Sequence, residues 1–449
     1  MRSRKIIVGL TAAALSLAGL GACAQPAGNN TTPPPSTPAT SATPTSQAPT
    51  TAAPGPSGTL EIFSWWVAGS EALGLAELQK VLAQKYPDIK FVNNGASTGG
   101  GSAKDVLQTR MLAGQPPDSF QVHAGKEAQD YIAAGQLQDV SGLYTEFGLT
   151  TVFPKDLVDM LTQGGKIYTI PSNVHRANVI WASIPALQKA GLPTDNVYFA
   201  TIADFIAALD KAKAAGIAAP LAIGTTWCQV HLLENVLIAD LGADKYNGLF
   251  NGTTDWKGAD VLAALKDFGK LMSYTNADRG DLDWEPALVK TIDTNAVFTI
   301  MGDWVPAAYD SRNLKMGTDW TWAPAPGTKG VYDFLADSYG ITTNAPNPAA
   351  AKAWLDVISS KEGQTAFNKV KGSIPARTDI DLTTFSAYQQ AAAASFKADA
   401  IVPSIQHGAA ATIAQGNATG TAVSKFTTSP MADANVATLQ AELAAAFAS

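Results

Sequence analysis

Residues 59–71 read Thr-Leu-Glu-Ile-Phe-Ser-Trp-Trp-Val-Ala-Gly-Ser-Glu, and this stretch organises the chain that follows. The alternation over residues 59–64 predicts a short strand. Trp65 and Trp66 come next, and a Gly-Ser pair before Glu71 predicts the start of a helix. In open α/β sheets, ligands bind at the carboxyl ends of strands. Either indole alone could be a core residue. Neighbouring side chains on an extended chain face opposite ways, however, so one of the two is predicted to line another surface.

This stretch begins a series of three strand–helix units. Helical spacing of apolar residues and turn signals between them indicate the boundaries. The predicted elements after the first strand are a helix over Glu71–Tyr86, a strand over Ile89–Val92, a helix over Ala103–Leu112, a short strand within 116–125, and a helix over Lys126–Ala134. Three such units in succession predict a parallel, doubly wound α/β lobe.

Two polar features belong to these units. The Gly-rich loop at residues 97–102 lacks the Walker spacing and its Gly-Lys-Ser/Thr ending, so it is interpreted as a flexible turn whose backbone approaches a neutral ligand. Gln121 and His123 lie two residues apart, so they share one face of their strand near its carboxyl end. The alternative for this pair is the solvated face of an edge strand.

The length of the chain predicts two lobes. About 390 residues follow residue 58, whereas a single core stops growing at roughly 250–300 residues. Residues 171–178 are predicted to cross into the second lobe. Later strands are predicted at Val297–Trp304, which ends in Asp303 and Trp304, and at Val331–Ile341, which contains Asp337. The expected boundaries are 59–172 with 299–345 for lobe 1, and 173–298 with 346–449 for lobe 2.

The N-terminal segment has the pattern of an export signal. A basic start, a short apolar run and small residues predict a signal peptide over residues 1–22. Leu20-Gly21-Ala22-Cys23 resembles the bacterial lipobox, in which the Cys becomes a diacylated N-terminus. Residues 24–58 carry no charged or aromatic side chain and predict a disordered tether from Cys23 to residue 58. An ordinary signal peptide with an incidental Cys23 is the alternative.

Charge and motif content exclude several functions. Removing the signal peptide with Arg2, Arg4 and Lys5 leaves 28 basic and 38 acidic residues, a net charge of −10. An acidic protein without a basic cluster is a poor binder of nucleic acid or anionic lipid. The four His form no metal motif, and nucleophile-elbow and dinucleotide patterns are absent. Cys228 is interpreted as a buried structural thiol, and the acidic residues at 281–285 as a solvated turn.

Tryptophan is the conspicuous residue type, with ten in the chain. An indole packs on the apolar C–H face of a sugar, while side chains of both charges bond its hydroxyl rim. Each net hydrogen bond gives only about 1 kcal/mol, so several must converge. This combination predicts a site for a neutral polyol. Five indoles lie beside polar residues at the ends of predicted elements: Trp65, Trp66, Trp227, Trp284 and Trp304.

Several segments together resemble a known family. They are Glu61–Trp66, Lys85–Ile89, Pro116–Gly125, Ile300–Trp304, Asp337–Gly340, Lys361–Gln364 and Lys371–Ile374, together with the lipobox and tether. They resemble the family 1 extracellular solute-binding proteins of ABC importers, and within these the glucose/mannose/galactose-binding branch.

The resemblance implies a two-lobed periplasmic-binding-protein fold (type II-like), each lobe a mostly parallel sheet flanked by helices, with the ligand in the cleft. It implies a monosaccharide ligand, a permease partner, no cofactor or metal, a monomeric chain, and lipid anchoring at the outer face of the cytoplasmic membrane. It also implies the binding residues. The indoles Trp65, Trp66, Trp284 and Trp304 wall the sugar; Glu71, Gln121, His123, Asp303, Asp337, Lys371 and His407 bond its hydroxyls; the backbone of Thr98 and Gly99 approaches it.

The leading hypothesis is therefore a lipid-anchored receptor that binds a hexose, glucose first, and delivers it to a permease. One alternative is an oligosaccharide receptor of the same family. The other is a secreted glycan-active enzyme with Glu71 and Asp337 as paired carboxylates, since glycoside hydrolysis needs two carboxyl groups across the bond.

Overall fold

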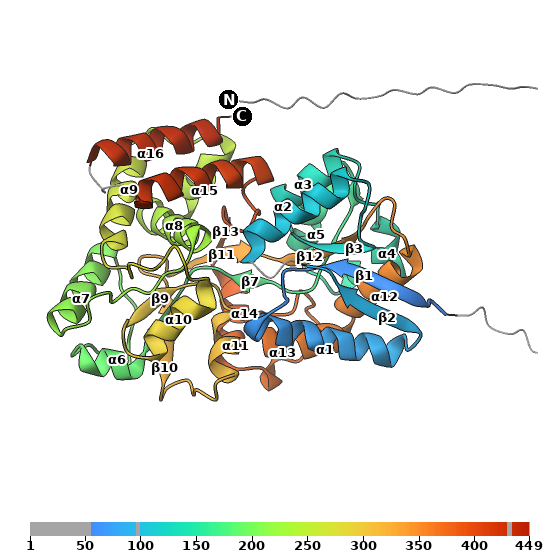
Figure 1. Ribbon diagram of the computed structural model, residues 1–449, viewed down its shortest axis with the longest axis horizontal. Helices are drawn as coiled ribbons and strands as arrows, with labels where there is room; N and C mark the ends of the chain where they lie inside the picture. Colours follow the sequence, from blue (N-terminus) through green and yellow to red (C-terminus); the bar gives the residue numbers. More distant parts are fainter. Residues whose placement is uncertain (1–54, 96–98, 429–432, 449) are drawn as a thin grey trace, which may run out of the picture. The chain divides into compact units, whose positions relative to one another are not determined.

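The fold is mixed α/β, as expected (Figure 1). The computed structural model describes residues 55–95, 99–428 and 433–448. The predicted signal peptide, Cys23, most of the predicted tether and Thr98 lie outside the described residues. Within the described part of the chain, no helix is long and apolar enough to cross a bilayer.

A five-stranded sheet contains the opening stretch. Its strands are β1 (Gly58–Phe63), β2 (Ile89–Asn93), β3 (Ser119–His123), β6 (Ile170–Pro171) and β12 (Asp337–Ile341), in the order β2-β1-β3-β12-β6. Strand β1 runs parallel to β2 and β3, which confirms the predicted strand–helix series. Strand β12 joins from far along the chain and is antiparallel to both β3 and β6.

Helices cover both faces of this sheet because its strands alternate their side chains (Figure 1). Leu60 and Ile62 point to the face covered by α1 (Gly69–Lys85) and α12 (Pro348–Ser359), and α13 (Lys361–Lys371) packs against α1. Phe63 points to the other face and packs with apolar residues of α2 (Gly99–Leu112) and α3 (Lys126–Ala133). Each such buried side chain contributes roughly 1.5–3 kcal/mol.

Two further sheets differ from the mostly parallel pattern expected of each lobe. One is β10-β8-β9, with β8 (Val179–Ser183) antiparallel to both β9 (Phe298–Ile300) and β10 (Trp320–Pro324). The other is β13-β11-β7, from β7 (His175–Arg176), β11 (Val331–Leu335) and β13 (Ala400–Pro403). Its β11 is parallel to β13 and antiparallel to β7. The partners of β8 come from distant segments, so no helical crossover between consecutive strands imposes a parallel direction.

The remaining elements are mostly helices around these sheets. They are α4 (Ser141–Glu146), α5 (Lys155–Leu161), β4 (Thr162–Gln163), β5 (Lys166–Ile167), α6 (Ile184–Lys189), α7 (Ile202–Ala214), α8 (Thr226–Asn251), α9 (Ala259–Met272), α10 (Trp284–Ile292), α11 (Val305–Asp310), α14 (Ala387–Ala398), α15 (Ile413–Thr428) and α16 (Asp433–Ala446). Helix α7 starts where the Thr201 hydroxyl accepts from the backbone N–H of Asp204 at 3.1 Å. Helix α8 is interrupted at Gly242, where φ is +72°.

The chain leads from one sheet to another at two neighbouring places. Residues 171–178, the predicted crossing, connect β6 of the five-stranded sheet to β7 of a three-stranded sheet. The single strand predicted over Val331–Ile341 is in fact two, β11 and β12, which belong to these same two sheets and are separated by Ala336. His175 pairs with Leu335, and Pro171 with Ser338, so the two passages run side by side.

The strand pairing also differs from the expected grouping of segments into lobes. The segment 299–345, assigned to lobe 1, contains or overlaps β9, β10 and β11. These strands pair with β8 and β7 rather than with the five-stranded sheet. Helices α12 and α13, in the segment assigned to lobe 2, pack against α1. We therefore propose that β12, α12 and α13 complete the first lobe.

Candidate ligand-binding site

A pocket lies at the carboxyl ends of β1 and β3, where ends of other elements meet them. The volume of its cavity is about 60 Å³. Its lining combines indoles with polar groups of both charges: Trp65, Trp66, Glu71, Lys104, His123, His175, Trp227, Trp284, Trp304, Leu335, Asp337, Lys371, Gln406 and His407.

The indoles come from four separate places in the sequence. Trp65 is half-buried, and its ring lies 5.0 Å from the His123 ring, whereas Trp66 is 1% exposed and packs on Phe367 at 4.9 Å. The two neighbours thus differ in surroundings, as the alternation rule predicts. Trp304 lies 6.3 Å from Trp227 and 6.4 Å from Trp284, measured between ring centroids.

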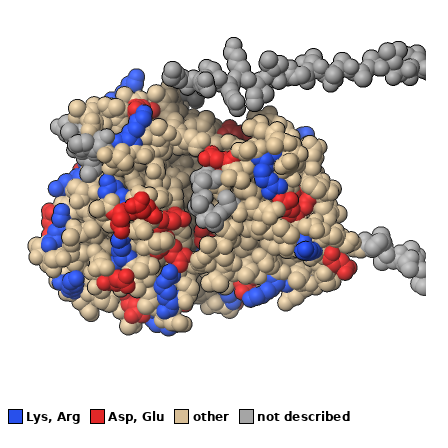
Figure 2. Space-filling model, viewed as in Figure 1, with Lys and Arg blue, Asp and Glu red and all other residues tan. Residues whose placement is uncertain are grey.

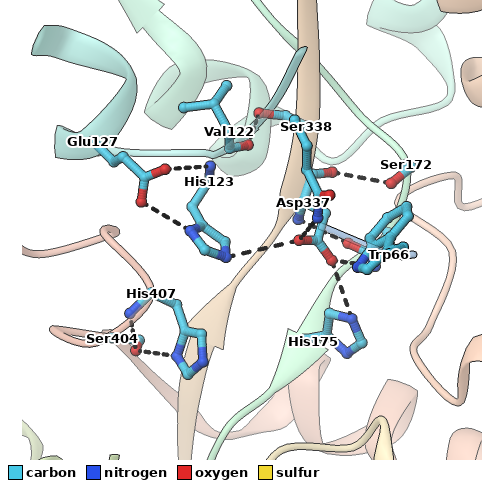
Figure 3. A network of polar contacts seen from close by, with 12 residues as sticks. Trp66, Val122, His123, Glu127, Ser172, His175, Asp337, Ser338, Ser404 and His407 are labelled. Atoms are coloured by element: carbon cyan, nitrogen blue, oxygen red, sulfur yellow. Dashed lines mark hydrogen bonds and ion pairs between the residues drawn. The ribbon is translucent and has the colours of Figure 1, made fainter. Parts of the chain in front are cut away.

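Asp337 is the central carboxylate of the site (Figure 3). Its oxygens accept hydrogen bonds from the side-chain amides of Gln121 at 2.8 Å and Asn173 at 2.9 Å. His175 Nε2 lies 3.2 Å from one oxygen and His123 Nε2 lies 3.7 Å from the other. Burial alone would raise the pKa of Asp337, but His175, His123 and Lys371 outweigh it and hold that pKa well below its ordinary value.

His123 is fixed from behind by Glu127. His123 Nδ1 lies 2.9 Å from the Glu127 carboxylate, which Lys104 Nζ also approaches at 2.7 Å. Burial opposes ionisation of Glu127, yet these two partners lower its pKa to about 2. Glu127 therefore stays charged and directs His123 Nε2 towards Asp337 and the pocket.

Two predicted ligand residues lie one layer beneath the pocket wall. Gln121 is 1% exposed and links Ser64, whose hydroxyl donates to it at 2.6 Å, to Asp337. Asp303 is wholly buried and bonds His175 Nδ1 and the backbone N–H of Arg176. Burial would lower the pKa of His175, but Asp303 and Asp337 raise it. Both residues thus orient groups that reach the pocket.

Lys371 and Glu71 form an ion pair across the pocket. Their Nζ and Oε1 atoms are 2.7 Å apart, and the Lys371 side chain is 2% exposed. Lys371 Nζ also lies 5.4 Å from the centroid of Trp66 and 5.7 Å from that of Trp304. A donor, an acceptor and two ring faces therefore converge on one point.

His407 completes the wall from the loop after β13. Its Nδ1 lies 2.9 Å from the Ser404 hydroxyl, which donates to Glu234 at 3.0 Å. Burial, with the nearby rings of His231 and His123, lowers the pKa of His407 well below its ordinary value. A neutral imidazole can both donate and accept, which suits a hydroxyl.

One group in the described part of the chain has the side chains of a metal site. His231, Glu234 and His407 are buried, and their ligand atoms lie within 4.8 Å of one another. The Ser404 hydroxyl already connects Glu234 to His407, so an ion there would have to displace this bridge. Cys228, in the same helix as His231, is wholly buried, as expected of a structural thiol.

The structure brings most of the predicted residues together and adds others. Gly99 is the first residue of α2, and Thr98 is outside the described residues. The added residues are Lys104, His175, Trp227, Leu335 and Gln406. Trp227 carries the same sequence signal as the other indoles, since it follows Thr225 and Thr226 at the start of a predicted helix. In the structure its Nε1–H donates to the Asp283 carboxylate at 2.8 Å.

The strand topology and a mixed-polarity pocket at the strand ends are typical of small-molecule binding proteins of the α/β class. The profile of the bacterial extracellular solute-binding protein family matches residues 68–365. The chain belongs to that family.

Individual relatives agree with this assignment. An uncharacterised ABC transporter extracellular-binding protein of Pyrococcus horikoshii is 36% identical over 356 residues, 78% of this chain and 79% of that protein. A probable sugar-binding periplasmic protein of Mesorhizobium japonicum is 31% identical over 379 residues, 82% of this chain and 88% of that protein. A solved chitin oligosaccharide binding protein has a TM-score of 0.75 at 20% identity, covering 88% of this chain and 100% of its own. At that identity the likeness shows the fold, and it confirms the expected fold class.

Proposed function

We propose that this chain is the sugar-binding receptor of an ABC importer, and that the pocket binds one hexose ring, glucose first with galactose and mannose as competitors. The observation that carries the proposal is the set of indoles around a mixed donor and acceptor rim. Trp65 and Trp304 offer ring faces, while His123, Asp337 and Lys371 offer polar groups to hydroxyls. The names of relatives such as the Mesorhizobium japonicum protein support a sugar ligand.

The charges of the pocket favour a neutral ligand. Glu71 and Asp337 face Lys371 and Lys104, so neither an anion nor a cation finds an excess of opposite charge. The exposed face in Figure 2 likewise intersperses acidic and basic residues. Hydroxyl groups can bond to both kinds of partner.

Sugar entry requires the pocket walls to move apart. A cavity needs a volume of roughly 10–15 Å³ to hold one water molecule. The pocket, with a volume of about 60 Å³, therefore holds only a few waters. A hexose has twelve non-hydrogen atoms and needs more room. The two side-by-side passages between sheets, at residues 171–178 and at Ala336, are where we expect the bending.

The paired-carboxylate enzyme hypothesis gains no support from Asp337. A glycosidase needs one carboxyl group that stays protonated as the general acid. The pKa of Asp337 is lowered by His175, and Glu71 is ion-paired with Lys371. The proposal also includes a monomeric chain that is lipid-anchored at Cys23 and delivers the sugar to a permease.

Isothermal titration of the mature chain with glucose, galactose, mannose and xylose tests the proposal. We expect saturable binding of a hexose with a stoichiometry of one. Trp65→Ala is the first variant, because Trp65 is half-buried whereas Trp66 also belongs to the core. Absence of binding to every sugar in the panel would reject the function.

A further inference from the structure

A buried pair of carboxyl groups lies beneath the part of the pocket wall that His407 forms. Glu234 of α8 and Asp333 of β11 are both wholly buried, and their carboxyl groups are in hydrogen-bonding contact. Strand β13 pairs with β11 and ends one residue before Ser404. The pair is therefore adjacent to the segment 404–407, whose last two residues line the pocket.

Glu234 holds this segment through two donors. The Ser404 hydroxyl lies 3.0 Å from both Glu234 oxygens and donates to them, and the backbone N–H of Gln406 donates to one of them at 2.9 Å. Ser404 Oγ in turn lies 2.9 Å from His407 Nδ1, and it accepts from the backbone N–H of His407 at 3.1 Å. Three side chains thus form a continuous line from Glu234 to the pocket.

The Ser404 hydroxyl has a single hydrogen, so its bonds determine where the hydrogen of the His407 ring lies. A hydroxyl that donates to Glu234 can only accept from the imidazole. Its two lone pairs then take the Nδ1–H and the backbone N–H of His407. Burial lowers the pKa of His407 well below its ordinary value, so the ring is neutral. With the hydrogen on Nδ1, the other ring nitrogen, Nε2, carries none and is an acceptor.

Asp333 disfavours the reverse order of donors. In that order Glu234 would donate a proton to Ser404, and Ser404 would donate to the imidazole. Burial raises the pKa of both Glu234 and Asp333, and one proton between them removes the repulsion of two buried charges. Apart from this contact, the Asp333 oxygens accept no hydrogen bond from any residue that the structure describes. The proton of the pair is therefore needed between the two carboxyl groups.

We propose that Glu234, acting through Ser404, is a positioning residue of the pocket that holds His407 in the tautomer with Nε2 as an acceptor. Figure 3 shows Nδ1 of His407 turned to Ser404 and the second ring nitrogen turned away from it. The ligand must present a hydroxyl donor to Nε2, because a fluorine or an ether oxygen has no hydrogen to give. The proposal rests on the sugar-binding function and specifies one group that the sugar must carry.

Nitrogen-15 NMR of the mature chain, labelled at its histidines and recorded without sugar, measures the tautomer. In a neutral imidazole the nitrogen without a hydrogen resonates far from the nitrogen that carries one. Couplings to the ring C–H protons show which nitrogen is which. The four His give four sets of signals, and His407→Gln identifies the set that belongs to His407. We expect a protonated Nδ1 and an unprotonated Nε2; a protonated Nε2 would overturn the proposal.

Ser404→Ala removes the hydroxyl through which Glu234 acts, so Nε2 is expected to gain the hydrogen in part of the molecules. Ser359→Ala is the matched control, since Ser359 is also buried and its hydroxyl donates to the Leu355 carbonyl oxygen at 2.7 Å, within α12. It should leave the His407 signals unchanged. The same tautomer in Ser404→Ala as in the natural chain would overturn the proposal.

Asp333→Asn tests the role of the carboxyl pair. The amide N–H of the new side chain can donate to Glu234 in place of the shared proton, so Glu234 still accepts from Ser404. This conservative variant should therefore keep the tautomer of His407. A protonated Nε2 in Asp333→Asn would contradict the order of donors given to Glu234 and Ser404.

Titration calorimetry with glucose and with derivatives that carry fluorine in place of one hydroxyl measures the consequence for the ligand. In the natural chain, fluorine at the position facing His407 should weaken binding about tenfold, because an unpaired buried acceptor costs about 1–3 kcal/mol. In Ser404→Ala this loss should shrink at that position alone, since Nε2–H can then face the fluorine.

Equal losses in the natural chain and in Ser404→Ala would overturn the demand for a hydroxyl at His407. A natural chain that binds no sugar would overturn the sugar-binding function and that demand with it. The tautomer is decided by the spectrum alone, so its failure and the failure of the sugar-binding function are separate results.

Discussion

At the scale of single residues, the polar groups of the pocket are already bonded to one another. Lys371 is paired with Glu71, and His123 lies between Glu127 and Asp337. A sugar hydroxyl must therefore replace or share these bonds rather than find free groups. Since each net hydrogen bond is worth only about 1 kcal/mol, the affinity depends on several such exchanges together.

Glu71→Gln should weaken hexose binding about tenfold, because a charge-assisted bond to the sugar becomes a neutral one worth roughly 1.4 kcal/mol less. The fold should not change, since the Glu71 side chain is partly exposed (21%). Titration calorimetry with glucose measures the effect. Glu77→Gln on the same helix, which removes the partner of Lys80, is the control and should bind glucose normally.

The buried carboxylate of Glu127 predicts a loss of stability in acid. Its pKa is lowered from the ordinary 4.5 to about 2. A lowered folded-state pKa gives stability that is present above pH 4.5 and is lost as the pH falls towards 2. From that shift we expect Glu127→Gln to cost roughly 3 kcal/mol at pH 7, and the difference from the natural chain to shrink in acid.

Urea unfolding at pH 7, 5, 4 and 3 measures this difference. Asp159→Asn is the control, because the pair that Asp159 forms with Lys155 is at the surface and such pairs contribute little. A difference between Glu127→Gln and the natural chain that stays constant over this range would contradict the assignment.

At the scale of elements, the end of α13 determines where Lys371 lies. The next residue, Gly372, has φ of +94°, and a Cβ there would come within 2.3 Å of the Asp303 carbonyl oxygen. A side chain would push α13 away from the turn that holds Asp303 and Trp304. The sequence Lys-Gly at a helix end thus fixes one donor of the pocket.

Gly372→Ala should destabilise the fold by about 3 kcal/mol, from backbone strain of about 1 kcal/mol and the clash with Asp303. It should also weaken glucose binding, because Lys371 moves with the helix end. Thermal unfolding and calorimetry measure the two effects. Gly216→Ala isolates the strain, since Gly216 has φ of +88° and a Cβ there meets no atom within 4 Å. Equal losses in both variants would contradict the clash.

The elements near the opening stretch could be predicted because their signals are local. Alternation, helical spacing and turn residues define β1, α1, β2 and β3 within a few residues. The break at Ala336 could not be predicted, because β11 and β12 follow one another with a single residue between them and differ only in their distant partners. The same holds for the antiparallel partners of β8.

The ends of the predicted strands and the family resemblance together predicted part of the candidate site. Trp65 and His123 follow or end neighbouring strands, so they meet at one edge of the sheet. Lys104 and Gln406 join them only through the packing of remote segments. Gln121 lies beneath the pocket wall instead of reaching the pocket. A sequence pattern does not distinguish these two positions, because they differ only in which side chains pack in front of the residue.

At the scale of the whole molecule, ligand binding should stabilise the fold. A ligand at a hundred times its Kd adds about 2.7 kcal/mol. For a chain of this length we expect a Tm rise of roughly 3 °C with saturating glucose. Differential scanning calorimetry measures it, with an acyclic hexitol as the control. No rise with any monosaccharide would contradict the pocket assignment.

Half of the tryptophans in the chain surround the pocket, namely Trp65, Trp66, Trp227, Trp284 and Trp304 of ten in total. Their emission wavelength and yield depend on the water and charges around each ring. The intrinsic fluorescence of this protein is therefore weighted towards one site, and sugar that displaces water from the pocket should shift the emission to shorter wavelength. Because these tryptophans are part of the chain, binding and dissociation rates can be followed by stopped-flow fluorescence without an added label.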